Sequence, residues 1–164
     1  MVTYTTSLPR AALGIAAGVI TGAALVTLWD RVGVSGIHEY WLRDALFIFT
    51  YAAVVWAAGV LVVALVPWAF LHHYGLRGWP VAVTLGAVLT FIVVCGFLTN
   101  GFGAYVASGN FSAADNGGPT WVSGRLTSHG WGEAIRFAAI CSAMGAVVGL
   151  VVWRTAYRRV PDGE

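Results

Sequence analysis

Histidine and carboxylate side chains are the groups in this sequence that could bind a metal ion. His38, His129 and Glu133 lie outside the long apolar runs of the chain, on the same predicted side of them. Imidazole and carboxylate groups are common ligands of zinc, so these three residues are the candidate metal ligands, with Glu39 and Asp115 nearby on the same side. Their spacing matches no local metal-binding motif, and ordinary interfacial histidines are the interpretation that we favour. We expect the protein to have no cofactor, and the identity of any bound metal is left unknown.

Cys95 and Cys141 are the two thiols that redox chemistry could use. They form no CxxC motif, and two cysteines are too few for a disulfide framework. If the helix with Cys95 runs outward and the helix with Cys141 runs inward, both thiols fall in the outer half of a membrane. A redox pair at similar depth is then geometrically possible. Buried cysteine usually behaves as a small apolar residue, so we expect two free thiols.

Several kinds of chemistry are disfavoured by what the sequence lacks. All nine basic residues are Arg, and without Lys neither a retinal Schiff base nor lysine covalent catalysis can form. No hydrolase, metalloprotease or nucleotide-binding motif is present, so we expect a protein that is not an enzyme. No ionisable residue lies in the middle of an apolar run, which argues against a proton-coupled transporter. The basic residues form no stripe that could follow phosphates, so no nucleic acid partner is expected.

Four long apolar runs are the elements that must position these groups. Of the residues, 59% are hydrophobic and 10% are charged, whereas a soluble domain has roughly 25% charged residues. A helix rises about 1.5 Å per residue and a hydrocarbon core is about 30 Å thick, so each run can cross a bilayer. We predict an all-α fold, a polytopic membrane protein with four transmembrane helices in an up-down-up-down bundle. One integral membrane domain would cover residues 1–164, with spans at about 11–29, 45–70, 81–99 and 134–153.

Tryptophan and proline residues support the ends of these spans. Seven of the eight Trp fall at predicted helix ends or in loops, and Trp56 lies deep in a span. The headgroup region favours the indole ring because one edge is polar and the rest is apolar. Pro67 predicts a kink in the last turns of the second span. Residues 107–132 are polar and rich in Gly, Ser and Asn, so an extramembrane loop is expected there, either folded onto the bundle or awaiting another protein.

Glycine residues recur every fourth position in the first and last spans. The candidate helix-packing residues are Gly14, Gly18 and Gly22 in the first span, and Gly145 and Gly149 in the last. This spacing makes a flat groove that lets another helix backbone approach closely. The groove could serve dimerisation, but packing within the same chain is the alternative that we favour.

The placement of Arg residues predicts the orientation in the membrane. One side of the predicted bundle carries Arg10, Arg77, Arg154, Arg158 and Arg159, and the other carries Arg31, Arg43, Arg125 and Arg136. Arg is enriched on the cytoplasmic side of membrane proteins. We therefore predict a bacterial inner membrane protein with both termini in the cytoplasm.

Three hypotheses of function remain. The leading one is a small, non-enzymatic accessory or interaction subunit, whose partners are the lipid bilayer and either further copies of itself or a larger membrane complex. The second is a small transporter or channel for a neutral or apolar solute. Its cavity would be lined by Thr84, Thr90, Thr99, Asn100 and Ser142. The third is a membrane protein that binds a metal or redox cofactor through His38 and His129.

Overall fold

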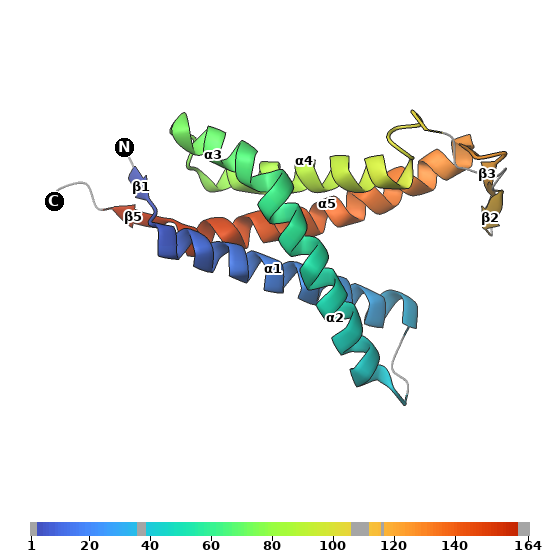
Figure 1. The fold of residues 1–164 in the computed structure, drawn as a ribbon, viewed down its shortest axis with the longest axis horizontal. Helices are drawn as coiled ribbons and strands as arrows, with labels where there is room; N and C mark the ends of the chain where they lie inside the picture. The colour runs from blue at the N-terminus through green and yellow to red at the C-terminus, as the bar shows by residue number, and fades with distance from the viewer. Residues whose placement is uncertain (1–2, 36–38, 106–111, 116, 161–164) are drawn as a thin grey trace. The chain divides into compact units, whose positions relative to one another are not determined.

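The computed structural model describes residues 3–35, 39–105, 112–115 and 117–160, and these are mostly helical (Figure 1). Four helical stretches are long and apolar enough to cross a membrane, so the prediction of four such helices is confirmed. The helices are α1 Leu8–Asp30, α2 Trp41–Ala58, α3 Leu65–His73, α4 Trp79–Leu98 and α5 Ser128–Ala156. Each stretch begins or ends within a few residues of a Trp, as the sequence predicts.

Two short π-helical segments extend these helices. The segment η1, Arg31–Ser35, continues α1 into a region where Gly33 was expected to break the helix. The segment η2, Gly59–Ala64, joins α2 to α3 without interruption. A π-helical turn contains an extra residue, so it leaves space before Pro67, whose ring would clash with the carbonyl group four residues earlier in a regular α-helix. The kink expected near Pro67 therefore takes the form of the six-residue π-helical segment Gly59–Ala64.

The chain divides into two compact units, Met1–Gly86 with Met144–Glu164, and Ala87–Ala143. In the first unit, α1 packs against α2 and also runs antiparallel to the end of α5. The strand β1, Thr3–Thr5, pairs antiparallel with β5, Arg158–Val160. The hydroxyl group of Thr6 adds a hydrogen bond of 2.7 Å to the carbonyl oxygen of Ala156. The start of α1 and the end of α5 are thus joined at the same end of this unit.

The second unit contains a small sheet where a loop was expected. Strands β2 Ala113–Asp115, β3 Gly118–Val122 and β4 Arg125–Leu126 form an antiparallel meander in this order. Ser123 and Gly124 connect β3 to β4, with φ angles of 50° and 74°. Positive φ at both central residues is typical of the type I′ turn, whose twist matches that of the paired strands.

A left-handed turn ends α4 in the same unit. Asn100, Gly101, Phe102 and Gly103 all have positive φ, between 49° and 80°. The hydroxyl group of Thr99 donates to the carbonyl oxygen of Cys95 at 2.6 Å and accepts from the N–H of Phe102 at 3.1 Å. The backbone reverses its handedness over these residues, so α4 ends at Leu98. Two glycines make that reversal less costly, since they carry no Cβ atom.

Candidate functional site

The glycine grooves of α1 are filled by helices of the same chain. A Cβ atom added to Gly14 would lie 3.0 Å from Cβ of Ala156, and one added to Gly18 would lie 2.5 Å from Cγ2 of Val152. Further along α1, a Cβ atom on Gly22 would meet the indole ring of Trp56 from α2 at 2.5 Å. These glycines therefore contact α5 at one end and α2 at the other, which is the packing within one chain that we favoured.

The glycines of α5 contact the first half of α4. A Cβ atom on Gly149 would overlap the carbonyl oxygen of Ala82, and one on Gly86 would overlap that of Gly145. The two helices run antiparallel: Ala82 contacts Gly149, whereas Gly86, later in α4, contacts Gly145, which is earlier in α5. Such close backbone contact is possible only where both helices carry small residues.

The hydroxyl groups proposed to line a solute cavity have other roles where the structure places them. Thr99 is only 1% exposed and makes the two bonds at the end of α4 that are described above. Ser142 donates to the carbonyl oxygen of Ala87 at 2.9 Å and so joins α5 to α4. Thr84 is exposed, while Thr90 and Asn100 are half-buried. The pocket lined by Trp68, Trp153 and Tyr157 includes none of these five residues.

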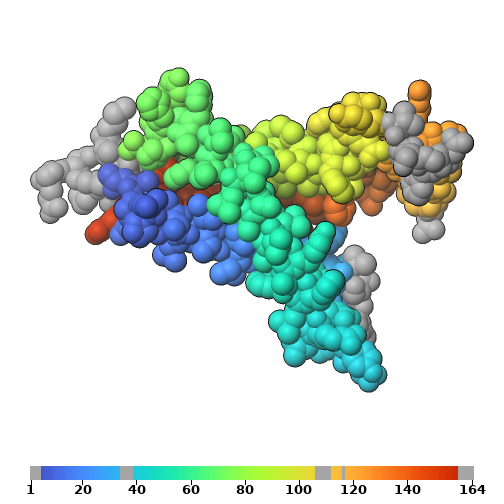
Figure 2. Space-filling model, viewed as in Figure 1, coloured from blue at the N-terminus to red at the C-terminus, as the bar shows by residue number. Residues whose placement is uncertain are grey.

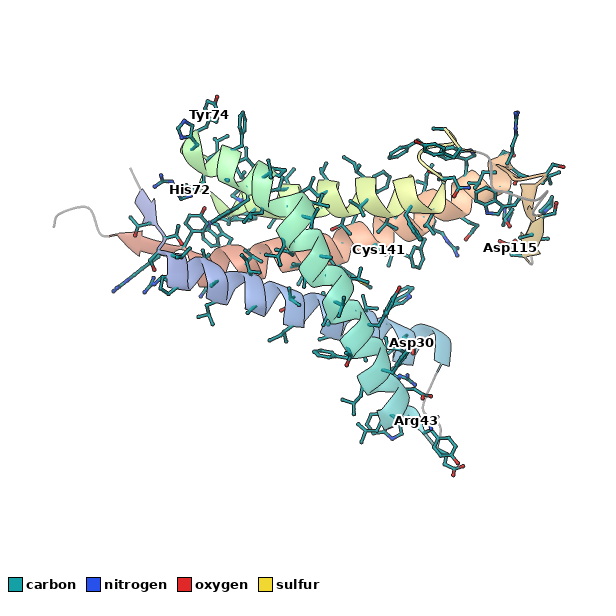
Figure 3. The ribbon with its side chains drawn as sticks, in the orientation of Figure 1. Asp30, Arg43, His72, Tyr74, Asp115 and Cys141 are labelled. Carbon is teal, nitrogen blue, oxygen red and sulfur yellow. The ribbon has the colours of Figure 1, made fainter. Side chains whose placement is uncertain are left out.

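Cys95 and Cys141 are both free thiols, as expected (Figure 3). The bond from Ser142 to Ala87 sets the register of the antiparallel pair α4 and α5. Cys141 is then level with the residue after Ala87, and Cys95 lies seven residues further along α4. At about 1.5 Å per residue the two thiols differ by about 10 Å along the helix axis, more than a disulfide can bridge. The depth of the two cysteines in a membrane stays a prediction.

His129, one of the proposed metal ligands, pairs with Asp115, which Figure 3 labels. Its Nε2 atom lies 2.7 Å from Oδ1 of Asp115, which also accepts a bond of 2.8 Å from the N–H of Gly117. The hydrogen bond from His129 and the bond from Gly117 lower the pKa of the Asp115 carboxyl group. Glu133 pairs instead with Arg136 at 3.1 Å, the ion pair expected from their spacing. The third candidate, His38, lies outside the described residues.

No group of three or more His, Cys, Asp or Glu side chains in the described ranges is arranged to bind a metal ion. The pair of His129 and Asp115 has another structural role, because it joins the end of β2 to the first turn of α5. Gly117 lies directly against the imidazole ring, so a Cβ atom there would come within 2.5 Å of Cε1.

Thr127 makes the second connection between the meander and α5. It is the N-cap of α5, since its hydroxyl oxygen accepts from the N–H of Gly130 at 3.1 Å. The same hydroxyl group donates to the carbonyl oxygen of Pro119 at 2.5 Å, and the backbone N–H of Thr127 donates to Thr120 at 3.0 Å. Gly130 permits this contact, because a side chain there would overlap the carbonyl group of Thr120. Two features of the sequence indicate this arrangement. One is the run of strand-favouring residues before Ser123 and Gly124, and the other is the Thr at the start of a helix. We used neither of them to predict the fold.

A pocket opens in the first unit. Trp68 from α3, Trp153 from α5 and Tyr157 just after α5 form its aromatic walls. Arg77 and Gly78, from the turn before α4, complete the rim. From the sequence, Arg77 could be described only as a basic residue in a turn. Its position beside Trp153 and Tyr157, some 80 residues later, cannot be inferred from spacing.

Asp30 and Arg31 form a largely buried ion pair where α1 passes into η1 (Figure 3). Nη2 of Arg31 lies 3.3 Å from Oδ2 of Asp30, and the two side chains are 11% and 23% exposed. By contrast, the neighbouring pair of Arg43 and Asp44 is 3.6 Å apart, with the Arg side chain 78% exposed.

Comparison with protein-family models, with curated proteins and with solved structures found no match to this chain.

Proposed function

We propose that the chain is an integral membrane protein that acts as a small, non-enzymatic accessory or interaction subunit. Its four apolar helices would form an up-down-up-down bundle in a bacterial inner membrane, with both termini on the cytoplasmic side. The pairing of β1 with β5 supports two ends on one side, because it joins the start of α1 to the end of α5. The three Arg residues after Val152 support the cytoplasmic assignment of that side.

The observation that carries the interaction role is the ordered meander between α4 and α5. Fixing a backbone costs about 1–2 kcal/mol per residue, so a segment that only connects two helices has no need of defined pairing. Here the last residue of β2 is bound to His129, and β3 is bound to Thr127 at the start of α5. A surface that is already ordered loses less entropy on binding, which is the advantage of such a segment for a partner protein.

The partner surface is assigned to the meander because the glycine grooves are occupied. Gly14, Gly18 and Gly22 all face helices of the same chain, so they are not available to a second protein. On the meander, Val122 is 49% exposed and the side chain of Arg125 is exposed beside it across the β3–β4 turn. An apolar and a cationic group side by side suit a partner with an apolar patch and a carboxylate.

The helix from α2 to α3 is the alternative surface for a partner. None of its most apolar window is buried inside the chain, and Figure 2 shows much of it uncovered by the other elements. Lipid is a sufficient neighbour for such a surface, since exposed Val and Leu side chains are favourable in hydrocarbon. We therefore assign this face to the bilayer and the meander to the partner.

The test is the mass of the complex that is extracted from native membranes in a mild detergent. We expect wild-type protein to be found in an assembly heavier than one chain, and Val122→Asp or Arg125→Glu to shift it towards the monomer. Arg158→Glu is the matched control, because Arg158 is also exposed but lies in β5. A wild-type monomer, or an assembly that is indifferent to the meander variants, would contradict the proposal.

Orientation is tested separately by thiol labelling of intact cells. A cysteine introduced at Val122 should react with a membrane-impermeant reagent, and one introduced at Arg158 should react only after the cells are opened. The natural cysteines give little background, because Cys95 is 3% exposed and Cys141 lies within α5. Labelling of position 158 in intact cells would refute cytoplasmic termini.

A further inference from the structure

Three exposed arginines lie at the end of the first unit where α1 begins and α5 ends, and together we call them the cationic end. They are Arg10, Arg154 and Arg158. Gly14 contacts Ala156, and α1 runs antiparallel to this part of α5. Arg10, one turn before Gly14, is therefore level with the residues that follow Ala156. Strand β5, which contains Arg158, begins there and pairs with β1 just ahead of α1 (Figure 1).

The charge of the cationic end is not balanced by carboxylates in the described part of the first unit. The described carboxylates of this unit are Asp30, Glu39 and Asp44. Asp30 is the last residue of α1, about 30 Å from Arg10 along the helix axis at about 1.5 Å per residue, and the other two follow it in the chain. None of the three arginines forms an ion pair with any described residue.

The nearby helix ends do not change the sign of this charge. The N-terminus of α1 has a partial positive charge and the C-terminus of α5 a partial negative charge, so the two contributions offset each other. The guanidinium groups therefore determine the potential, and an anion is the ligand that it favours.

An exposed apolar surface borders the cationic end. Leu13 is 60% exposed and lies three residues after Arg10, so the two side chains are neighbours on the surface of α1. In the last turn of α5, Trp153 precedes Arg154, and Trp is a residue type that gathers at the headgroup level of a bilayer. A ligand that meets both surfaces needs a negative group joined to an apolar chain. An anionic phospholipid has this chemistry.

We propose that the cationic end binds the phosphate groups of anionic phospholipids, whose acyl chains lie along the exposed apolar side of α1 beside Leu13. Guanidinium and phosphate form paired, charge-assisted hydrogen bonds, which are stronger than bonds between neutral groups. Each Arg close to an anionic lipid surface contributes about fivefold in affinity. The inference rests on the membrane placement proposed above, but not on the interaction role of the meander.

The experiment is native mass spectrometry of the purified full chain, titrated with phosphatidylglycerol or with phosphatidylcholine of the same acyl chains. Phosphatidylcholine has the same phosphate but no net charge. Wild-type protein should bind its first phosphatidylglycerol more tightly than its first phosphatidylcholine. The double variant Arg10→Gln/Arg154→Gln should lose about 25-fold in affinity for phosphatidylglycerol, about fivefold for each charge, with little change for phosphatidylcholine.

The matched control is Arg43→Gln/Arg136→Gln, which removes the same net charge. Both of these arginines are exposed, but they form ion pairs with Asp44 and Glu133, so the affinity for phosphatidylglycerol should change little. Arg10→Lys/Arg154→Lys keeps both charges and should recover most of the affinity, and circular dichroism checks that every variant is folded. Equal losses in the two glutamine variants, or equal binding of the two lipids by wild-type protein, would overturn the inference.

Two other sources of negative charge are outcomes of the same test. If inorganic phosphate displaces phosphatidylglycerol more than acetate does at equal ionic strength, the cationic end takes phosphate from solution and the assignment to lipid is wrong. An acidic protein surface would show itself differently. Arg10→Gln/Arg154→Gln would then reduce the mass of the complex from native membranes and leave the preference for phosphatidylglycerol unchanged, which would also overturn the inference.

The outcome is independent of the test of the meander. Equal binding of the two lipids together with an intact, meander-dependent complex would refute only the lipid surface. Selective binding of phosphatidylglycerol by a protein that is monomeric in native membranes would refute only the accessory role.

Discussion

The contact between α4 and α5 predicts a large difference between two glycine-to-alanine substitutions. A Cβ atom on Gly86 would overlap the carbonyl oxygen of Gly145 and lie 3.1 Å from its carbonyl carbon. Backbone atoms cannot rotate away as a side chain can, so the two helices must separate. At Gly59 a Cβ atom would meet nothing within 4 Å, and its backbone is helical with φ −59° and ψ −46°. Gly59→Ala is therefore the matched control.

The magnitude follows from two opposing contributions. Alanine gains about 0.5–1 kcal/mol over glycine inside a helix at either position. Overpacking at Gly86 costs about 1–3 kcal/mol, so Gly86→Ala should be less stable than Gly59→Ala by about that amount. Gly149→Ala should behave like Gly86→Ala, because it would overlap the carbonyl oxygen of Ala82. The double variant should lose less than the sum of the two, since one separation of the helices relieves both overlaps.

The assay is reversible unfolding by SDS in mixed micelles, followed by tryptophan fluorescence. The unfolding midpoints should be ordered Gly59→Ala, then wild type, then Gly86→Ala. Equal midpoints for the two alanine variants would refute the close backbone contact, and fully additive losses in the double variant would refute a shared helix separation.

Three further predictions concern polar groups. Asp30→Asn should lower the free energy of unfolding by about 3 kcal/mol in the same assay, because it leaves the charge of Arg31 largely buried. Arg43→Gln, at an exposed ion pair, should change the free energy of unfolding by less than about 1 kcal/mol. Similar losses in the two variants would count against a buried pair of Asp30 and Arg31. Thr99→Val should cost about 1–3 kcal/mol, since it removes the acceptor of the Phe102 N–H in a residue of the same shape, and Thr84→Val, at an exposed position, is its control. The pKa of Asp115 is lowered in the folded chain, so its bond stabilises the meander above the ordinary pKa of 3.8 and is lost as the pH falls below it. Hydrogen exchange at the Gly117 amide should therefore accelerate at acid pH beyond its intrinsic change in wild type but not in Asp115→Asn, and the same pH response in both would refute the assignment.

The helices could be predicted because their signals are local. Runs of apolar residues identified all four, and Trp residues such as Trp79 and Trp153 indicated where they end. The spacing of Gly14, Gly18 and Gly22 indicated a packing face, although it could not say which residues cover it. Trp56 illustrates the difference: its depth in a span was evident, but its contact with Gly22 depends on how α2 crosses α1.

The features that we did not predict depend on contacts between distant residues or on unusual backbone. Each strand of the meander has at most five residues, too few for a clear alternating pattern. Helix continuation through Gly33 runs against its low helix propensity and depends on the surrounding structure. The positions at which α4 meets α5, such as Gly86 against Gly145, depend on contacts between the two helices. Spacing within one helix contains no information on that register.

The glycine groove of α1 also has a consequence for biogenesis. Its partners on α5 are made late: Ala156, which covers Gly14 and accepts the bond from Thr6, lies 150 residues after that threonine. In the membrane placement proposed above, α1 would enter the bilayer during synthesis with this end of the groove open, and the groove would stay open until α5 is inserted. In that interval the groove can accept any small-residue helix nearby, including α1 of another nascent chain. Several ribosomes close together on one mRNA would then favour wrongly paired chains. This risk ends once the fold is complete, because α5 then fills the groove.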